Sequence, residues 1–224
     1  QTKIIYNSVQ RVLEKSSEGL TYSGFEKLDK NESYMYISNH RDIILDTCLL
    51  NVVLFEQDLR MTASAIGDNL VKKPFLLLLS KINRNFLVQR GLSPREMLQS
   101  SQKLSEYIRH LLLEEKRSVW MAQRQGRTKD GNDSTQQGVL KMLAMAKGEQ
   151  SIAEYFARIK IVPVSISYEF DPTDVLKMPE IMAKRMEETY IKSANEDFNS
   201  IMKGALGNKG RIHIEAGDVI EKEW

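Results

Sequence analysis

Short strand-like runs alternate with runs of helical periodicity along most of the chain. The strand-like runs are Tyr34–Ser38, Met61–Ile66, Asn85–Gln89, Val119–Ala122, Ile161–Tyr168 and Gly210–Ala216. The helical runs are 4–13, Asp46–Phe55, Phe75–Ile82, 93–116, Gln137–Ala146, Ser151–Ala157 and the mostly charged Pro179–Gly204. Helices between successive strands favour parallel pairing, because parallel neighbours need a long crossover connection. We therefore predict an α/β fold with a mixed, mostly parallel central sheet flanked by helices.

The chain is long enough for one sizeable domain, with 224 residues, and its hydrophobic fraction of 42% is enough for a core. It has no internal repeat or low-complexity linker, so we predict a single domain over residues 1–224 with a helical segment over about residues 1–20. With 32 basic and 30 acidic residues the net charge is only +2, which argues against nucleic acid as a partner. The single cysteine, Cys48, excludes an internal disulfide and is typical of a reducing compartment.

One histidine stands apart from the other two in the chain. His110 lies in a charged helical segment and His213 on the polar face of a strand, so we interpret both as solvated or packing residues. His40 follows the strand Tyr34–Ser38 and precedes a helix whose first turn carries Asp46. A carboxylate that holds one imidazole nitrogen leaves the other free to accept a proton from a hydroxyl near pH 7. The residues alone leave two roles open for His40, a catalytic base or a cap of the following helix.

Basic residues follow two further strands. Arg90 comes after the strand-like run 85–89, and the segment Gln123–Arg127, with two arginines and a glycine, comes after the run 119–122. Arginines and free backbone amides near a helix N-terminus bind anions such as phosphate. A single arginine of this kind is more typical of a surface charge. Because ligands of open α/β sheets gather at the strand C-termini, the combination with His40 predicts one site there.

Two other features are set aside. Asp130–Asp133 has the composition of a calcium-binding loop, but the acidic ligand expected at the twelfth position of such a loop is replaced by Lys141. Cys48 is near His40 in the sequence, but it lies in an apolar run and is expected to be a core residue rather than a nucleophile. We predict no metal site.

The order of these features resembles that of the glycerophospholipid acyltransferase superfamily, which includes glycerol-3-phosphate and 1-acylglycerol-3-phosphate acyltransferases. The blocks that carry the resemblance are Ser38-Asn39-His40 with Asp46; Phe86-Leu87-Val88-Gln89-Arg90; Val119-Trp120-Met121-Ala122 leading to Gln125-Gly126-Arg127-Thr128; and Ile161-Val162-Pro163-Val164-Ser165-Ile166. The closing segment Arg211–Glu215 is also similar. Each block is weak alone, but their order is fairly specific from about Tyr34 to Ser167. The resemblance implies a glycerol-3-phosphate acyltransferase-like domain with its active site at the strand C-terminal ends.

The chain departs from the family pattern in two places. Five residues separate His40 from Asp46, where the family usually has four, so the carboxylate role belongs either to Asp46, which we prefer, or is shared with Asp42. Gln125 stands where the family usually has glutamate, which keeps a hydrogen-bond acceptor but removes the charge. The alignment around Gly126 also leaves open whether Arg124 or Arg127 fills the family's arginine position.

The resemblance implies transfer of a fatty acyl group from an acyl thioester, either acyl-CoA or acyl-carrier protein, to a hydroxyl of glycerol 3-phosphate or 1-acylglycerol 3-phosphate in phospholipid biosynthesis. His40 would be the general base and Asp46 its orienting partner. The acceptor would be held by Arg90, Gln125, Gly126, Arg127 and Lys141, with Gln125 on a glycerol hydroxyl and backbone amides near Gly126 on the oxyanion. No cofactor is implied beyond the acyl donor.

The family also implies a cytoplasmic enzyme that associates peripherally with a membrane. The basic pair Lys72-Lys73, beside the apolar helix start Phe75–Leu79, suits an anionic membrane surface, although a plain core helix explains the same residues. Two alternatives remain. A relative that binds lipid or phosphate without catalysis would retain the fold, and a thioesterase-like hydrolase would use the same His/Asp pair to activate water.

Overall fold

The computed structural model describes residues 2–71, 74–193 and 195–221 of the chain, and its centre is a single sheet. The strands are β1 (Gly19–Ser23), β2 (Met35–Ser38), β3 (Thr62–Gly67), β4 (Asn85–Val88), β5 (Ser118–Ala122), β6 (Ile161–Tyr168) and β7 (Arg211–Ala216). Their order across the sheet is β1-β7-β6-β2-β5-β3-β4. Only β6 and β7 pair antiparallel, and every other described neighbouring pair is parallel. The prediction of a mixed, mostly parallel sheet is confirmed.

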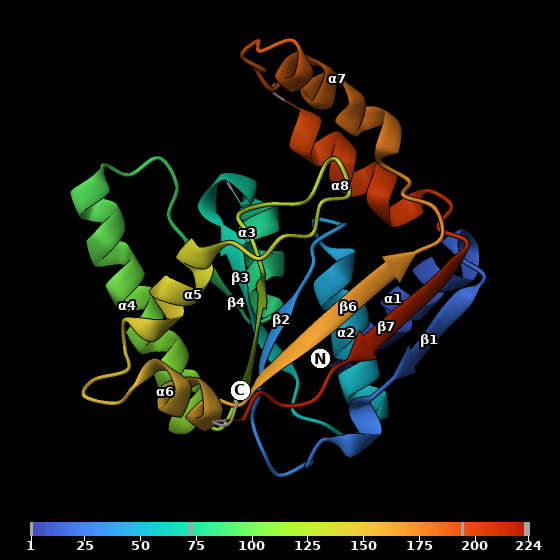
Figure 1. Ribbon diagram of the computed structural model, residues 1–224. Helices are drawn as coiled ribbons and strands as arrows, with labels where there is room; N and C mark the ends of the chain where they lie inside the picture. The colour runs from blue at the N-terminus through green and yellow to red at the C-terminus, as the bar shows by residue number, and fades with distance from the viewer. Residues whose placement is uncertain (1, 72–73, 194, 222–224) are drawn as a thin grey trace.

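Helices cover both faces of the sheet (Figure 1). They are α1 (Thr2–Ser16), α2 (Leu45–Glu56), α3 (Pro74–Ile82), α4 (Pro94–Leu113), α5 (Gln137–Ala144), α6 (Ile152–Arg158), α7 (Asp174–Arg185) and α8 (Glu196–Leu206), with short 3-10 turns at Phe25–Lys27 and Asp68–Leu70. Because side chains alternate along a strand, Tyr36 packs with α1 and α2 on one face, whereas Met35 packs with α4, α5 and α6 on the other. The result is a three-layer α/β arrangement.

Two helices begin where their capping residues predict. Ser93 caps α4 through a capping box with Glu96, and Pro94 occupies the first turn, where its missing amide hydrogen costs nothing. Ser151 and Glu154 form the same reciprocal pair at the start of α6. The helix predicted over 93–116 is therefore present with its start in the expected place.

The first strand, β1, was absent from the sequence prediction, which placed a helical segment over about residues 1–20. The helix α1 ends at Ser16, and residues 19–23 pair in parallel register with β7 at the edge of the sheet. Strand β1 is only five residues long, contains glycine, serine and threonine, and has no buried residue. An edge strand of this composition has neither the apolar alternation nor the length that marks a strand in a sequence.

The prediction of one charged helix over Pro179–Gly204 is also wrong. The segment forms two helices, α7 and α8, which together make a hairpin beyond the end of β6 (Figure 1). Helix α7 begins before Pro179, at Asp174, and ends near Glu187, which has a positive φ of 58°. Pro179 lies inside α7 rather than in its first turn, although an interior proline removes one backbone hydrogen bond and crowds the preceding turn, so reading this proline as a helix start placed the start too late.

Candidate active site

The turn between β2 and α2 places His40 directly against Asp46. The Nδ1 atom of His40 lies 2.8 Å from Oδ2 of Asp46, and the imidazole is nearly buried, with 13% of its side chain exposed. Strand β2 ends at Ser38, so His40 comes just after it, while Asp46 is in the first turn of α2. A carboxylate in the first turn also interacts favourably with the helix dipole. The extra residue in the turn does not prevent the contact that the sequence predicted.

Asp46 is completely buried, yet each of its oxygens accepts hydrogen bonds. Its Oδ2 accepts from the backbone amides of Arg41 at 2.7 Å and Asp42 at 3.1 Å, in addition to His40. Its Oδ1 accepts from the hydroxyl of Tyr168 at 2.8 Å. A buried carboxylate stays ionised only when such donors replace water. With its Nδ1 bound to this carboxylate, the His40 ring leaves Nε2 for a substrate proton.

Asp42 has a different role from Asp46, since it caps the start of α2. The sequence left open which of the two carboxylates, Asp42 or Asp46, orients His40. Its Oδ1 accepts from the backbone amides of Ile44 at 2.9 Å and Leu45 at 2.8 Å, so Asp42 satisfies the exposed donors at the start of α2. Burial, followed by the nearby charge of Asp46, raises the pKa of the Asp42 carboxyl above its ordinary value. Asp42 therefore builds the turn, and Asp46 orients the imidazole.

The residues on either side of His40 are fixed by the neighbouring strands. The side chain of Asn39 both accepts from the backbone amide and donates to the carbonyl of Ile166 on β6. Trp120 on β5 donates through Nε1 to the hydroxyl of Ser38 at 2.9 Å, and its ring meets the His40 ring edge-on at a centroid distance of 5.5 Å. Because β5 and β6 are the two neighbours of β2, the histidine is held from both sides.

The polar loop after β5 packs against the same turn. The amide of Thr128 donates to the carbonyl of His40 at 3.1 Å, and Arg41 forms an ion pair with Asp133 at 2.5 Å. The amide of Gln125 donates to the side chain of Gln136 at 2.8 Å, which closes the loop at its base. Gly126 has a φ of +75°, a conformation that glycine adopts without strain. The loop and the turn between β2 and α2 therefore form one structural unit.

A cavity of about 500 Å³ opens beside His40, and its wall is mainly apolar. Of the residues predicted for the site, His40, Arg90, Gln125 and Gly126 lie on this wall, and Asp46 lies behind His40. Arg127 and Lys141 are not part of the wall. Arg124, the alternative to Arg127 that the sequence left open, lies on the wall, and so does Arg84, which was not predicted.

The two arginines of the loop differ in their surroundings. Arg124 donates through Nη1 to the carbonyl of Asn132 at 3.1 Å, and its buried Nε has no partner among the described residues. The buried Nη1 of Arg127 likewise has no partner in the described part of the chain. Arg127 is close enough to Asp42 to lower the pKa of that carboxyl, which opposes part of the rise caused by burial. Arg124 therefore faces the cavity, and Arg127 supports the turn.

The residues set aside as structural behave as expected. His213 bonds to the hydroxyls of Thr21 at 2.8 Å and Ser23 at 3.1 Å on the neighbouring strand, and His110 is exposed beside glutamates. Cys48 is half-buried, packs against the core and also reaches the cavity wall, where burial raises the pKa of its thiol to about 12. A thiol with so high a pKa is a poor nucleophile. Among the described residues, no group of three or more metal-ligating side chains is gathered.

A family model described as acyltransferase matches residues 19–167, which is well over half of the chain. The chain belongs to the acyltransferase family. The expectations of an O-acyltransferase and of the glycerophospholipid acyltransferase superfamily are confirmed at the level of the family, and the matched region contains both His40 and Asp46. No protein with a curated description matches the sequence.

The fold of this acyltransferase is also found in a solved structure. It is the 1-acyl-sn-glycerophosphate acyltransferase PlsC from Thermotoga maritima, with a TM-score of 0.58 and 14% sequence identity. The match covers 99% of this chain and 69% of PlsC. In the described part of the acyltransferase, no helix combines the length and the hydrophobicity needed to cross a membrane. The Lys72-Lys73 pair, which the sequence suggested for membrane contact, lies outside the described residues.

Proposed function

We propose that this acyltransferase moves a fatty acyl group from an acyl thioester to a hydroxyl of glycerol 3-phosphate or 1-acylglycerol 3-phosphate. The observation that carries the proposal is the His40–Asp46 pair, joined at 2.8 Å, at the wall of a largely apolar cavity. A base held by a buried carboxylate suits proton removal from a hydroxyl, and an apolar cavity suits an acyl chain. PlsC, which shares the fold, is a 1-acyl-sn-glycerophosphate acyltransferase, and this supports the choice of acceptor.

The reaction requires one base and no acyl-enzyme. His40 Nε2 takes the proton of the acceptor hydroxyl as its oxygen attacks the thioester carbonyl carbon. The new C–O bond forms, the C–S bond breaks, and the thiolate leaves. A thiol has a pKa of only about 8.5, so the thiolate departs without a dedicated acid and takes up a proton afterwards. Asp46 holds the ring and balances the charge of the imidazolium, as in a Ser-His-Asp triad in which the substrate supplies the hydroxyl.

The phosphate of the acceptor would bind beside the histidine. Arg90 and Arg124 reach the cavity wall after the ends of two strands, and Gln125 and Gly126 line the same wall. A guanidinium suits this task because it offers paired donors to phosphate oxygens. We assign a glycerol hydroxyl to the Gln125 side chain and the oxyanion to backbone amides near Gly126. Arg127 and Lys141 would contribute through long-range charge, since neither is on the wall.

The acyl chain would occupy the apolar part of the cavity. Its wall includes Ile43, Val52, Ile66, Val71, Leu104 and Met142, which come from several different elements. Burial of each methylene of the chain contributes about 0.8 kcal/mol, so a cavity of this kind favours long acyl groups. The donor would be acyl-CoA or acyl-carrier protein, and no cofactor is required beyond it.

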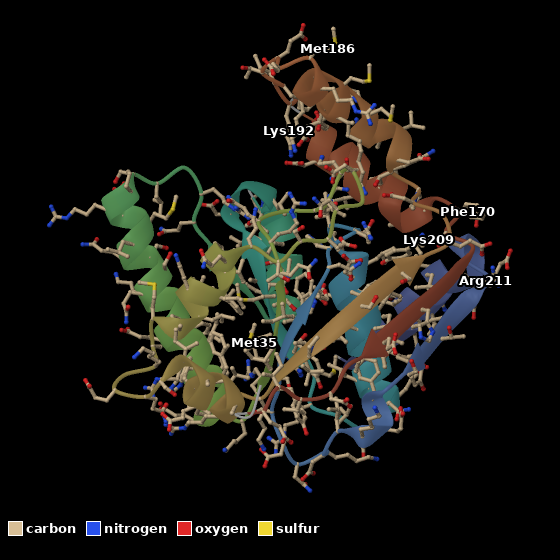
Figure 2. All side chains as sticks on the ribbon, in the orientation of Figure 1. Met35, Phe170, Met186, Lys192, Lys209 and Arg211 are labelled. Atoms are coloured by element: carbon tan, nitrogen blue, oxygen red, sulfur yellow. The ribbon has the colours of Figure 1, made fainter. Side chains whose placement is uncertain are left out.

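We further propose that the α7–α8 hairpin brings the enzyme to a membrane on the cytoplasmic side. The exposed apolar residues are Val175, Met178, Met182 and Met186 on α7, and Phe198, Met202 and Leu206 on α8. On each helix these residues recur at a spacing of three or four, so they share one face, and gathered exposed apolar residues mark contact surfaces. Ile201 of α8 lies on the cavity wall, so the hairpin also reaches the site. Figure 2 shows Met186 at the far end of the hairpin and Phe170 at its base.

Thiol release tests the transferase. Wild type and His40→Ala would be incubated with acyl-CoA or acyl-carrier protein, with and without glycerol 3-phosphate or 1-acylglycerol 3-phosphate, and the lipid product identified by mass spectrometry. Release that requires an acceptor and is lost in His40→Ala supports transfer. Release without an acceptor would show a hydrolase, and binding of lysophospholipid by a folded protein that releases no thiol would show a non-catalytic relative.

Vesicle sedimentation tests the membrane surface. The double variant Met182→Glu/Met186→Glu should lose binding to vesicles of phosphatidylcholine and phosphatidylglycerol, because it places charges where the bilayer would be. Ile152→Glu on α6 is the matched control, since Ile152 is similarly exposed but on a helix outside the hairpin. Equal binding by both variants and by wild type would exclude the hairpin as the docking element.

A further inference from the structure

The Asp46 carboxylate has one donor that the catalytic pair does not require. Its Oδ2 already accepts from His40 Nδ1 and from two backbone amides, whereas its Oδ1 accepts from the hydroxyl of Tyr168 at 2.8 Å. Tyr168 is the last residue of β6 and lies one position beyond the match to the family model, which ends at residue 167. None of the family blocks in the sequence includes this tyrosine.

The fold places Tyr168 at the catalytic turn for a simple reason. Strand β6 has eight residues and β2 only four, so β6 continues past the end of its neighbour. The side chain of Asn39 extends the pairing by bonding to Ile166 in both directions. Since side chains alternate along a strand, Tyr168 shares the face of Ile166, which packs with α2. Asp46 is in the first turn of that helix.

We propose that Tyr168 is a positioning residue, which holds the Asp46 carboxylate in the orientation that presents Oδ2 to His40. Without a donor on Oδ1, the carboxylate can turn about its last bond and weaken its contact with Nδ1. Hydrogen bonds to an ionised acceptor are the stronger kind, so one such bond fixes this orientation. The role rests on the proposed function, because it concerns the base of the same reaction.

The hydroxyl of Tyr168 keeps its proton at neutral pH and well above it. Burial, and then the charges of Asp46 and Asp42, raise the pKa of Tyr168 well above its ordinary value. Tyr168 is therefore always a donor to Asp46 and never a competing anion. The other groups that face the pair are Asp42 in the turn, Cys48 in α2 and Arg127 in the loop after β5, and of these Asp42 is the carboxylate with a raised pKa.

Tyr168→Phe tests the role, because it removes the hydroxyl and keeps the ring. We expect kcat to fall about tenfold, as for loss of one hydrogen bond to a charged group, with little change in KM. We also expect the acidic limb of the pH–rate profile, which reports protonation of the base, to move to higher pH. A carboxylate with one donor fewer attracts the imidazolium proton more strongly. Repeating the profile in an Asp42→Asn background removes the titration of that neighbour.

Tyr34→Phe is the matched control, since Tyr34 is buried and its hydroxyl bonds to the backbone of Asp29 at the other end of β2. It should lose stability without any change in the pH–rate profile. A Tyr168→Phe enzyme with wild-type kcat, or with a lower kcat and an unmoved profile, would overturn the positioning role.

The inference can also be tested when no substrate is turned over, which separates its failure from that of the proposed function. The ring of His40 can be titrated by NMR, with His110→Gln and His213→Gln variants to assign its signals. We expect its titration midpoint to move to higher pH in Tyr168→Phe. An unchanged midpoint in a folded protein would exclude the role, whatever reaction the enzyme catalyses.

Discussion

Gly204 of α8 packs directly on the carboxylate of Asp42 in the catalytic turn. A Cβ built on Gly204 would overlap Oδ2 of Asp42, which leaves no room for any other residue at this position. Lys177 of α7 donates to the carbonyl of Arg41 at 3.4 Å and forms an ion pair with Asp171, so the hairpin contacts the same turn at a second point. The hairpin therefore supports the turn that holds His40 in addition to presenting its apolar surface.

Gly204→Ala should destabilise the protein by about 1–3 kcal/mol, the usual cost of overpacking, and should lower activity by displacing the turn. The free energy of unfolding in urea and kcat measure the two effects. Asp42→Ser shortens the side chain and keeps an oxygen that can cap α2. If the contact is the cause, the double variant Asp42→Ser/Gly204→Ala loses less than the sum of the single changes. Simple additivity would show that Gly204 acts in some other way.

Asp46 and Asp42 make a matched pair for testing which carboxylate serves catalysis. Asp46→Asn should lower kcat by several orders of magnitude with the fold intact, because the amide no longer fixes the imidazole tautomer; a similar change in serine proteases costs about 10⁴-fold. Asp42→Asn keeps the oxygen that caps α2 and should retain most of the activity. Steady-state kinetics of both variants decide the matter. Equal losses would mean that the carboxylates share the role.

Asp42 also makes stability depend on pH in a defined direction. Its folded-state pKa is raised above the ordinary 3.8, so the folded protein holds this proton more tightly than the unfolded chain does. The contribution of the protonated group is fully present below about pH 3.8 and is lost as the pH rises through the raised pKa. Relative to wild type, Asp42→Asn should therefore gain stability as the pH rises from about 4 to 7. Urea unfolding at several pH values measures the difference, and a constant difference would contradict the assignment.

The sequence predicted the structure best where the signal lies in neighbouring residues. The His40–Asp46 contact follows from a strand end and a helix start six residues apart, and the core strands from continuous apolar runs. The role of Tyr168 could not be predicted in this way, because its partner Asp46 is 122 positions away in the sequence. The contact forms only because β6 extends beyond the end of β2. The sequence predicted Tyr168 only as the end of the strand Ile161–Tyr168, and nothing local indicated a carboxylate beside it.

The same distinction applies to the basic residues. Arg124 and Arg127 are equivalent in the sequence, and only the conformation of the loop places Arg124 on the cavity wall and Arg127 beside Asp42. The prediction of a single helix over Pro179–Gly204 failed for another reason. Between Pro179 and Gly204 the segment has no further proline or glycine, so the break between α7 and α8 has no strong local stop signal.

The basic residues on and off the cavity wall should differ in their effect on acceptor binding. Arg90→Gln and Arg124→Gln should each raise KM for glycerol 3-phosphate or 1-acylglycerol 3-phosphate about tenfold or more, because each removes a charge-assisted contact with the phosphate. Lys141→Gln, on the exposed surface of α5, should change KM little and in a salt-dependent way. KM measured at low and high salt for the three variants provides the comparison. A large effect of Lys141→Gln that persists in high salt would bring that residue back into the phosphate site.

Tyr36 offers a test of the core in which the substitution should stabilise the protein. Its hydroxyl is fully buried and has no hydrogen-bond partner among the described residues, and burial raises its pKa well above the ordinary value. An unsatisfied buried hydroxyl costs about 1–3 kcal/mol, so Tyr36→Phe should stabilise the protein by about 1 kcal/mol and raise Tm by about 2–4 °C. Tyr34→Phe, just before the same strand, removes a hydroxyl bonded to Asp29 at 2.8 Å and should lower Tm by a similar amount. Scanning calorimetry of both variants gives the signs, and a lower Tm in Tyr36→Phe would show that this hydroxyl is bound to a buried water.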